Sequence, residues 1–198
     1  MITVSRRYEL KRRAERQEKT RQRIVEAAVG LHGSIGMART TVTQIAERAG
    51  VGRQTVYRHF PDELALGRAC SGLYWERNPL PDPRPWRAVA DPHDRLQLGL
   101  RESYAYHRRT EAMISRAFAD AADSPIMQSY HDHWQRAADV IVAAWRVRGR
   151  VRSLLRAAVG HAIVFPTWYS LVRDQGLTDA QAVELMLRLT CDCEPSDA

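Results

Sequence analysis

Residues 44–60 have the sequence QIAERAGVGRQTVYRHF, in which a small residue, a glycine and an aliphatic residue follow one another at fixed offsets. Ala46 is small enough for two helices to cross closely, and Gly50 permits the positive φ that a tight turn requires. Val56, six residues beyond Gly50, is placed to pack against Ile45 and Ala46. The stretch therefore predicts a helix-turn-helix, with a purely structural helical hairpin as the alternative.

The residues on either side extend this prediction to a four-helix unit. Thr41 and Gln44 form a T-x-x-Q capping box, which predicts that the second helix begins there. A third helix is expected from about Arg53 to His59, and Pro61 suits the first turn of a fourth. Apolar residues at helical spacing predict a first helix from about residue 20 to Gly33.

The basic residues are concentrated in the first third of the chain. Residues 1–60 contain 13 Lys or Arg and 5 Asp or Glu, whereas the rest contains 17 and 18. This asymmetry predicts a nucleic-acid-binding segment joined to a nearly neutral domain, with a membrane-surface arm as the competing interpretation. Residues 1–19 form a basic arm, either flexible or a frayed helical extension, that we expect to contact phosphate rather than remain merely solvated.

Five prolines between residues 78 and 92 exclude a regular helix there and indicate a linker. The sequence thus predicts an all-α fold with a basic arm, a helix-turn-helix DNA-binding domain, a proline-rich linker and a helical ligand-binding and dimerisation domain. The expected ranges are 1–19, 20–77, 78–91 and 92–198. Within the last domain, the expected helices are 92–109, 111–121, 124–149, 150–173 with a bend at Pro166, and 178–190.

Composition and motifs exclude several classes of protein. The three cysteines, Cys70, Cys191 and Cys193, suggest no disulfide framework. No export signal is visible, and the longest apolar stretch is too short to span a bilayer, so we expect a cytoplasmic protein. The absence of P-loop, GxSxG, Rossmann and HExxH patterns argues against an enzyme, and no cofactor is expected. His131 and His133 would point about 200° apart on a helix, so no metal site is expected.

The stretch from about Thr20 to Leu73 resembles the DNA-binding domain of the TetR/AcrR family of bacterial regulators. The residues that carry this resemblance are Thr41-Val42, Ile45-Ala46, Ala49-Gly50-Val51, Thr55-Val56-Tyr57 and Phe60-Pro61. The remaining part is similar only in length and helical pattern. The resemblance implies a ligand-responsive homodimer, most often a repressor, that binds a palindromic operator in double-stranded DNA. The alternatives are a helical protein that binds DNA without sequence preference and an enzyme that carries a helix-turn-helix.

The helix led by Arg53 is expected to read bases in the major groove. Arg53 suits the O6 and N7 atoms of guanine, and Gln54 suits the N6 and N7 atoms of adenine. Thr55 is expected to contact a phosphate or a thymine methyl group.

Further DNA contacts are expected along the backbone. By resemblance, Tyr57 and His59 contact the backbone, although either could instead pack within the protein. Thr41, at a helix N-terminus, offers its hydroxyl and amide to a phosphate. Family members often carry a lysine near the start of the fourth helix, but this chain has Glu63, which places that contact in doubt.

The helical domain contains many aromatic residues at helical spacing, which favour either a plain core or a cavity. The resemblance implies a cavity for a small apolar or amphipathic effector. The candidate ligand-binding residues are Tyr104, His107, Trp134, His161, Phe165 and Trp168.

The last two helices carry apolar stripes suited to a four-helix bundle between two subunits. The alternative is that these stripes form only the core of one subunit. The stripes are Leu154, Leu155, Ala158 and Ala162, and Ala182, Leu185, Met186 and Leu189.

Overall fold

The computed structural model describes residues 2–121 and 124–191, and every regular element in these ranges is helical. The prediction of an all-α fold is confirmed. The chain divides into two compact units. One comprises the residues up to Pro79 together with Ser115–Ile126, and the other comprises Leu80–Ile114 and the residues from Met127 onward. In the described ranges, no helix has the length and apolar character needed to cross a bilayer.

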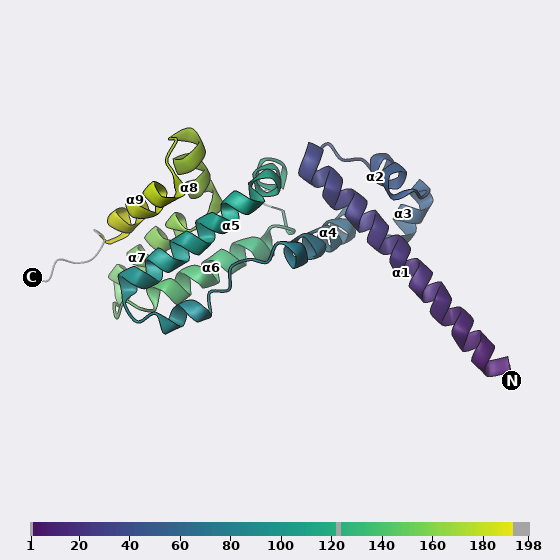
Figure 1. Cartoon of the computed structure of the whole chain (residues 1–198), viewed down its shortest axis with the longest axis horizontal. Coiled ribbons are helices and arrows are strands. Elements are labelled where there is room, and N and C mark those ends of the chain that lie inside the picture. The colour runs from purple at the N-terminus through teal and green to yellow at the C-terminus, as the bar shows by residue number, and fades with distance from the viewer. Residues whose placement is uncertain (1, 122–123, 192–198) are drawn as a thin grey trace, which may run out of the picture. The chain divides into compact units, whose positions relative to one another are not determined.

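Four helices build most of the first unit around a small apolar core. Ile24 and Ala28 are completely buried, and they pack with Ile45, Val56 and Leu66 from the other three helices. The first helix contacts both the second and the fourth. The helices are α1 (Ile2–Ile35), α2 (Val42–Ala49), α3 (Arg53–His59) and α4 (Glu63–Arg77) (Figure 1).

The N-terminal basic segment is part of α1, not a flexible arm. The expectation of a helix beginning near residue 20 is wrong, because α1 runs without a break from Ile2 to Ile35. Residues 2–19 contain neither glycine nor proline and are rich in good helix formers, so the helix has no local reason to stop. The basic extension is therefore a helical rod of about 27 Å, from the helical rise per residue.

The second unit is also built of helices, preceded by a short 3₁₀ turn in the proline-rich segment. The elements are η1 (Pro85–Ala88), α5 (Pro92–Ala121), α6 (Gln128–Val142), α7 (Gly149–Ala162), α8 (Phe165–Tyr169), the π-helical η2 (Ser170–Asp174) and α9 (Asp179–Cys191) (Figure 1). α5 also contributes its last turns to the first unit.

Several predicted helix ends in this unit are wrong. The expected break near residue 110 is absent, because the Thr110 hydroxyl bonds to the Tyr106 carbonyl (2.8 Å) and is accommodated within α5. Gly149 does not end a long helix. It begins α7 with a φ of 58°, and α6 has already ended at Val142. The helix expected to bend at Pro166 is instead separated into α7, α8 and η2.

The predicted capping boxes are confirmed. The backbone N–H of Gln44 donates to the Thr41 hydroxyl, and the backbone N–H of Gln181 donates to the Thr178 hydroxyl; each distance is 3.3 Å. The fourth helix, however, begins at Glu63 and not at Pro61, because the Asp62 carboxylate accepts from the Ala65 amide (2.6 Å) and caps it.

The described cysteine is buried and unreactive. Burial raises the pKa of the Cys70 thiol to about 12, which keeps it protonated. The side chain of Cys191 and the whole of Cys193 lie outside the described residues.

Candidate functional site

The turn between α2 and α3 has the geometry that the sequence predicts. Gly50 adopts a φ of 64° and a ψ of 43°, and its amide donates to the carbonyls of Ala46 and Glu47. Ile45 and Ala46 of α2 and Val56 of α3 are almost fully buried, so the two helices pack against each other through apolar side chains. This packing fixes the direction of α3, the expected recognition helix.

The outer face of α3 is polar and open to solvent. Arg53, Gln54, Tyr57 and Arg58 are exposed, and they lie on one side of the helix because they are spaced at i, i+1, i+4 and i+5. Val56 faces the opposite way and is buried. The structure therefore brings together the expected base-reading residues and adds Arg58, which sequence reasoning missed. The signal for Arg58 is its place four residues after Gln54.

The backbone-contact candidates differ in their surroundings. Thr55 is half-buried, and Tyr57 is 49% exposed. His59 is half-buried against α1, and its Nε2 atom is buried with no partner among the described residues. Burial, followed by the nearby Arg58 and Arg21, lowers the pKa of His59, so its ring is neutral at physiological pH. A neutral ring that turns one nitrogen inward is a weaker candidate for phosphate contact than Tyr57.

The N-terminus of α2 offers donors other than those predicted for Thr41. The Thr41 amide donates to the Gln44 side chain (2.8 Å), and its hydroxyl contacts the same oxygen (3.1 Å). The capping box thus occupies both groups. The amides of Val42 and Thr43 come too early in the helix to bond within it, so they are the donors that remain for a phosphate.

The second unit gathers most of the predicted ligand-binding residues around His107. The ring centroids of Trp134, Phe165 and Trp168 lie 4.9, 5.7 and 6.0 Å from that of His107. Tyr104 lies 6.3 Å away, and its hydroxyl donates to the Ala162 carbonyl (2.9 Å). All five side chains are buried.

His161 lies outside this aromatic group. Its side chain is on the surface and approaches the hydroxyl of Thr167 within 3.4 Å. His161 lies in the last turn of α7 with its side chain exposed, so the structure does not bring it to the other candidate ligand-binding residues.

His107 carries a polar atom that the protein does not satisfy. Its Nε2 lies 2.9 Å from the Ile163 carbonyl, which can only accept, so Nε2 bears the hydrogen. Burial lowers the pKa of His107 to about 4, which leaves Nδ1 as a bare acceptor at neutral pH. Nδ1 of His107 and Nε1 of Trp134 are both buried without a hydrogen-bond partner in the described parts of the chain. An acceptor and a donor thus remain available on two touching rings.

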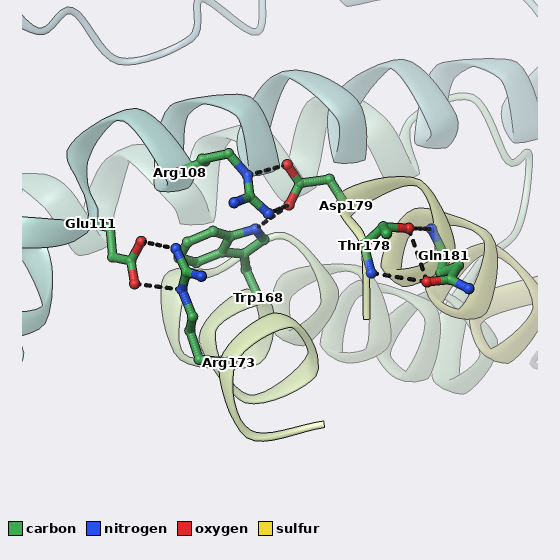
Figure 2. Close-up of polar contacts among 7 residues, drawn as sticks. All are labelled: Arg108, Glu111, Trp168, Arg173, Thr178, Asp179 and Gln181. Carbon is green, nitrogen blue, oxygen red and sulfur yellow. Dashed lines mark hydrogen bonds and ion pairs between the residues drawn. The ribbon is translucent and has the colours of Figure 1, made fainter. Parts of the chain in front are cut away.

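Besides its contact with His107, Trp168 contacts a group of charged side chains (Figure 2). Its Nε1 donates to Asp179 (2.9 Å), and the guanidinium groups of Arg108 and Arg173 lie 5.7 and 5.9 Å from its ring centroid. Arg108 also pairs with Asp179, and Arg173 pairs with Glu111. Trp168 therefore offers a ligand only its ring face, because its polar atom already bonds α8 to α9.

The expected dimerisation stripes are divided between the core and the surface. Leu155 and Met186 are buried within the unit, whereas Leu154 and Leu189 are each 55% exposed. α7 and α9 pack against each other, so the exposed leucines belong to neighbouring helices (Figure 1). In the described ranges, no group of three or more His, Cys, Asp or Glu side chains is arranged to hold a metal ion.

The chain is similar in sequence to known bacterial transcriptional regulators. Residues 24–70 match the family model of bacterial regulatory proteins of the tetR family. The chain is 38% identical over 119 residues to the HTH-type transcriptional regulator SrpR of Pseudomonas putida, covering 60% of this chain and 47% of SrpR. It is 37% identical over 119 residues to the uncharacterised HTH-type transcriptional regulator TtgW, also of Pseudomonas putida, covering 60% of this chain and 75% of TtgW.

The fold is also found in solved structures. The transcriptional regulator FadR from Bacillus subtilis, solved in complex with stearoyl-CoA, superposes with a TM-score of 0.58 at 17% identity. The superposition covers 88% of this chain and 99% of that structure. The chain thus spans about half the length of SrpR but nearly the whole of this structural neighbour.

Proposed function

We propose that this chain, which belongs to the TetR family of bacterial transcriptional regulators, binds a palindromic operator as a homodimer and is released by a small molecule. The observation that carries the proposal is the exposed polar face of α3, held outward by the buried Val56. Arg53 and Gln54 lead this face and would read bases, while Tyr57, Arg58 and the first amides of α2 would contact phosphates. Repression is the expected outcome, in the bacterial cytoplasm and without enzymatic activity.

Competition between two DNA fragments tests sequence-specific binding. We expect DNA from upstream of the protein's own gene to remain bound in the presence of excess random DNA of the same length, at fixed salt concentration. Equal competition by both fragments would contradict the proposal and favour a DNA-binding protein without sequence preference.

The helical extension of α1 is proposed to strengthen binding to any DNA sequence. Lys11, Arg12 and Arg13 are exposed, and they point around the helix in different directions. Arg12→Ala should weaken binding to operator and random DNA by the same few-fold factor. It should also reduce by about 1 the slope of the logarithm of the binding constant against the logarithm of the salt concentration. Fluorescence anisotropy at several salt concentrations measures both. Arg146→Ala, a matched change at an exposed arginine of the second unit, is the control. A loss confined to the operator would contradict this role.

The effector is proposed to be a small, largely apolar molecule with a neutral hydroxyl or amide group. Such a group can donate to the bare Nδ1 of His107 and accept from Nε1 of Trp134, the two buried atoms without partners among the described residues. The surrounding rings of Phe165 and Trp168 would bury its apolar part. Ligand binding would favour a dimer spacing that no longer matches the operator, with a coupling of about 1–3 kcal/mol.

The dimer is proposed to form through α7 and α9, where Leu154 and Leu189 expose apolar surface. Such a dimer would present two recognition helices about 34 Å apart, one DNA turn. The double variant Leu154→Glu/Leu189→Glu should be monomeric by analytical ultracentrifugation, because four carboxylates would be buried in the interface. Glu substitutions at the exposed Arg87 and Arg146, which lie outside α7 and α9, are the control and should leave the dimer intact. A dimer that survives the leucine changes would place the interface elsewhere.

A further inference from the structure

A groove of about 680 Å³ lies between α6 and the proline-rich segment. His133, Arg136 and Val140 of α6 and Ala143, which directly follows this helix, line it at spacings of 3, 4 and 3 residues. Asp82, Pro83, Arg84 and Arg87 line the opposite wall, and Arg95 of α5 also contributes. The aromatic group around His107 does not line this groove.

The acidic groups of the groove are already neutralised. The guanidinium of Arg84 pairs with Asp82 (2.7 Å), and Arg156 pairs with Asp139 (2.6 Å), a residue of α6 that also lines the groove. Arg87 and Arg136, by contrast, have no ion-pair partner within the part of the chain that the structure describes. Both are exposed, so their charges are free to meet a ligand.

A third cation lies beneath these two. Arg95 is only 8% exposed, and its guanidinium donates to the carbonyls of Val89 (2.8 Å), Val140 (3.1 Å) and Arg87 (3.1 Å). An arginine remains charged when buried, and carbonyl groups satisfy its hydrogens without cancelling its charge. Because the surroundings have a low dielectric constant, this charge acts more strongly on the groove than an exposed one would. The same bonds hold both walls in place.

His133 adds an unpartnered nitrogen beside the free cations. Its ring bonds to the Pro81 carbonyl, and its Nε2 is buried without a partner in the described residues, so Nδ1 is the atom that donates to Pro81. Burial and then Arg136 lower the pKa of His133, whereas the Pro81 carbonyl and Asp82 raise it. A bound anion would oppose the effect of Arg136 and favour a proton on Nε2, which would then donate to that anion.

We propose that this groove binds an organic oxyanion, a carboxylate or phosphate group carried on a small apolar body. Arg87 and Arg136 would hold the oxyanion by charge-assisted hydrogen bonds, above the fixed charge of Arg95. Pro83, Val140 and Ala143 supply the apolar walls for the rest of the molecule. The groove differs in chemistry from the proposed effector site around His107, where the available atoms are neutral. The inference does not depend on whether the chain binds an operator.

Calorimetric titration of phenyl phosphate and of benzoate into the full chain, at constant ionic strength, tests the site. Wild-type protein should bind one or both saturably. Arg87→Gln/Arg136→Gln should bind at least about tenfold more weakly, because two charge-assisted bonds are lost. Arg146→Gln/Arg152→Gln removes the same charge from exposed positions outside the groove and should stay within about twofold of wild type. Equal binding by the two double variants, or no saturable binding to wild type, would overturn the proposal.

The histidine provides a second readout. Sulfate keeps its charge across the range in which histidines titrate. Adding sulfate should raise the pKa of His133, followed by its ring resonances in NMR, in wild-type protein but much less in Arg87→Gln/Arg136→Gln. An equal response in both proteins would place the anion elsewhere and would also overturn the proposal.

Discussion

Arg53→Ala should weaken binding to the operator roughly ten- to hundredfold while changing binding to random DNA far less. Arg53 is exposed in the first turn of α3, the helix expected to enter the major groove. A bidentate arginine–guanine contact contributes about 1–3 kcal/mol of discrimination, which corresponds to this range. Parallel titrations of operator and random duplexes, at one salt concentration, give the two affinities directly.

Two controls separate base reading from simple charge. Arg53→Lys keeps the charge but loses the planar fork, so it should lose most of the preference while retaining affinity for random DNA. An operator with 7-deazaguanine at the contacted position removes the N7 acceptor. It should weaken wild-type binding but have little further effect on Arg53→Ala. Equal losses on operator and random DNA for Arg53→Ala would show that this residue contacts phosphate instead.

The parts of the fold that the sequence predicts correctly are those determined by neighbours in the chain. A capping box such as Thr41 and Gln44 involves residues three positions apart, and the turn at Gly50 depends on a single backbone conformation. The burial of Val56 follows from the same short motif. Each of these features lies within about fifteen residues of its partners, so no knowledge of distant packing is needed.

The incorrect predictions involve signals with more than one structural meaning. Glycine permits a positive φ at either end of a helix, and Gly149 uses it to begin α7. Other features of the candidate sites depend on packing between residues far apart in the sequence. His59 is half-buried because α1 lies beside it, near Arg21 and Glu18, some forty residues earlier. The closure of the aromatic group around His107 likewise depends on Ile163, 56 residues away.

The unfolding free energy should fall by about 3 kcal/mol between pH 6.5 and pH 4 because of His107 alone. The pKa of His107 is about 4 in the folded protein, because burial disfavours the charged ring, and near 6.5 in the unfolded chain. Between these values the unfolded state binds a proton that the folded state does not, so protonation favours unfolding as the pH falls. Well above pH 6.5 this residue is neutral in both states, and its contribution is constant.

Urea unfolding of His107→Gln at a series of pH values isolates this effect. Glutamine does not titrate, and its amide can still donate to the Ile163 carbonyl, so the variant should lose the pH-dependent part of the stability difference between pH 6.5 and pH 4. If the His107→Gln and wild-type profiles were parallel over this range, the pKa of His107 would be the same in the folded and the unfolded state. The conclusion that burial keeps Nδ1 unprotonated near neutral pH would then be wrong.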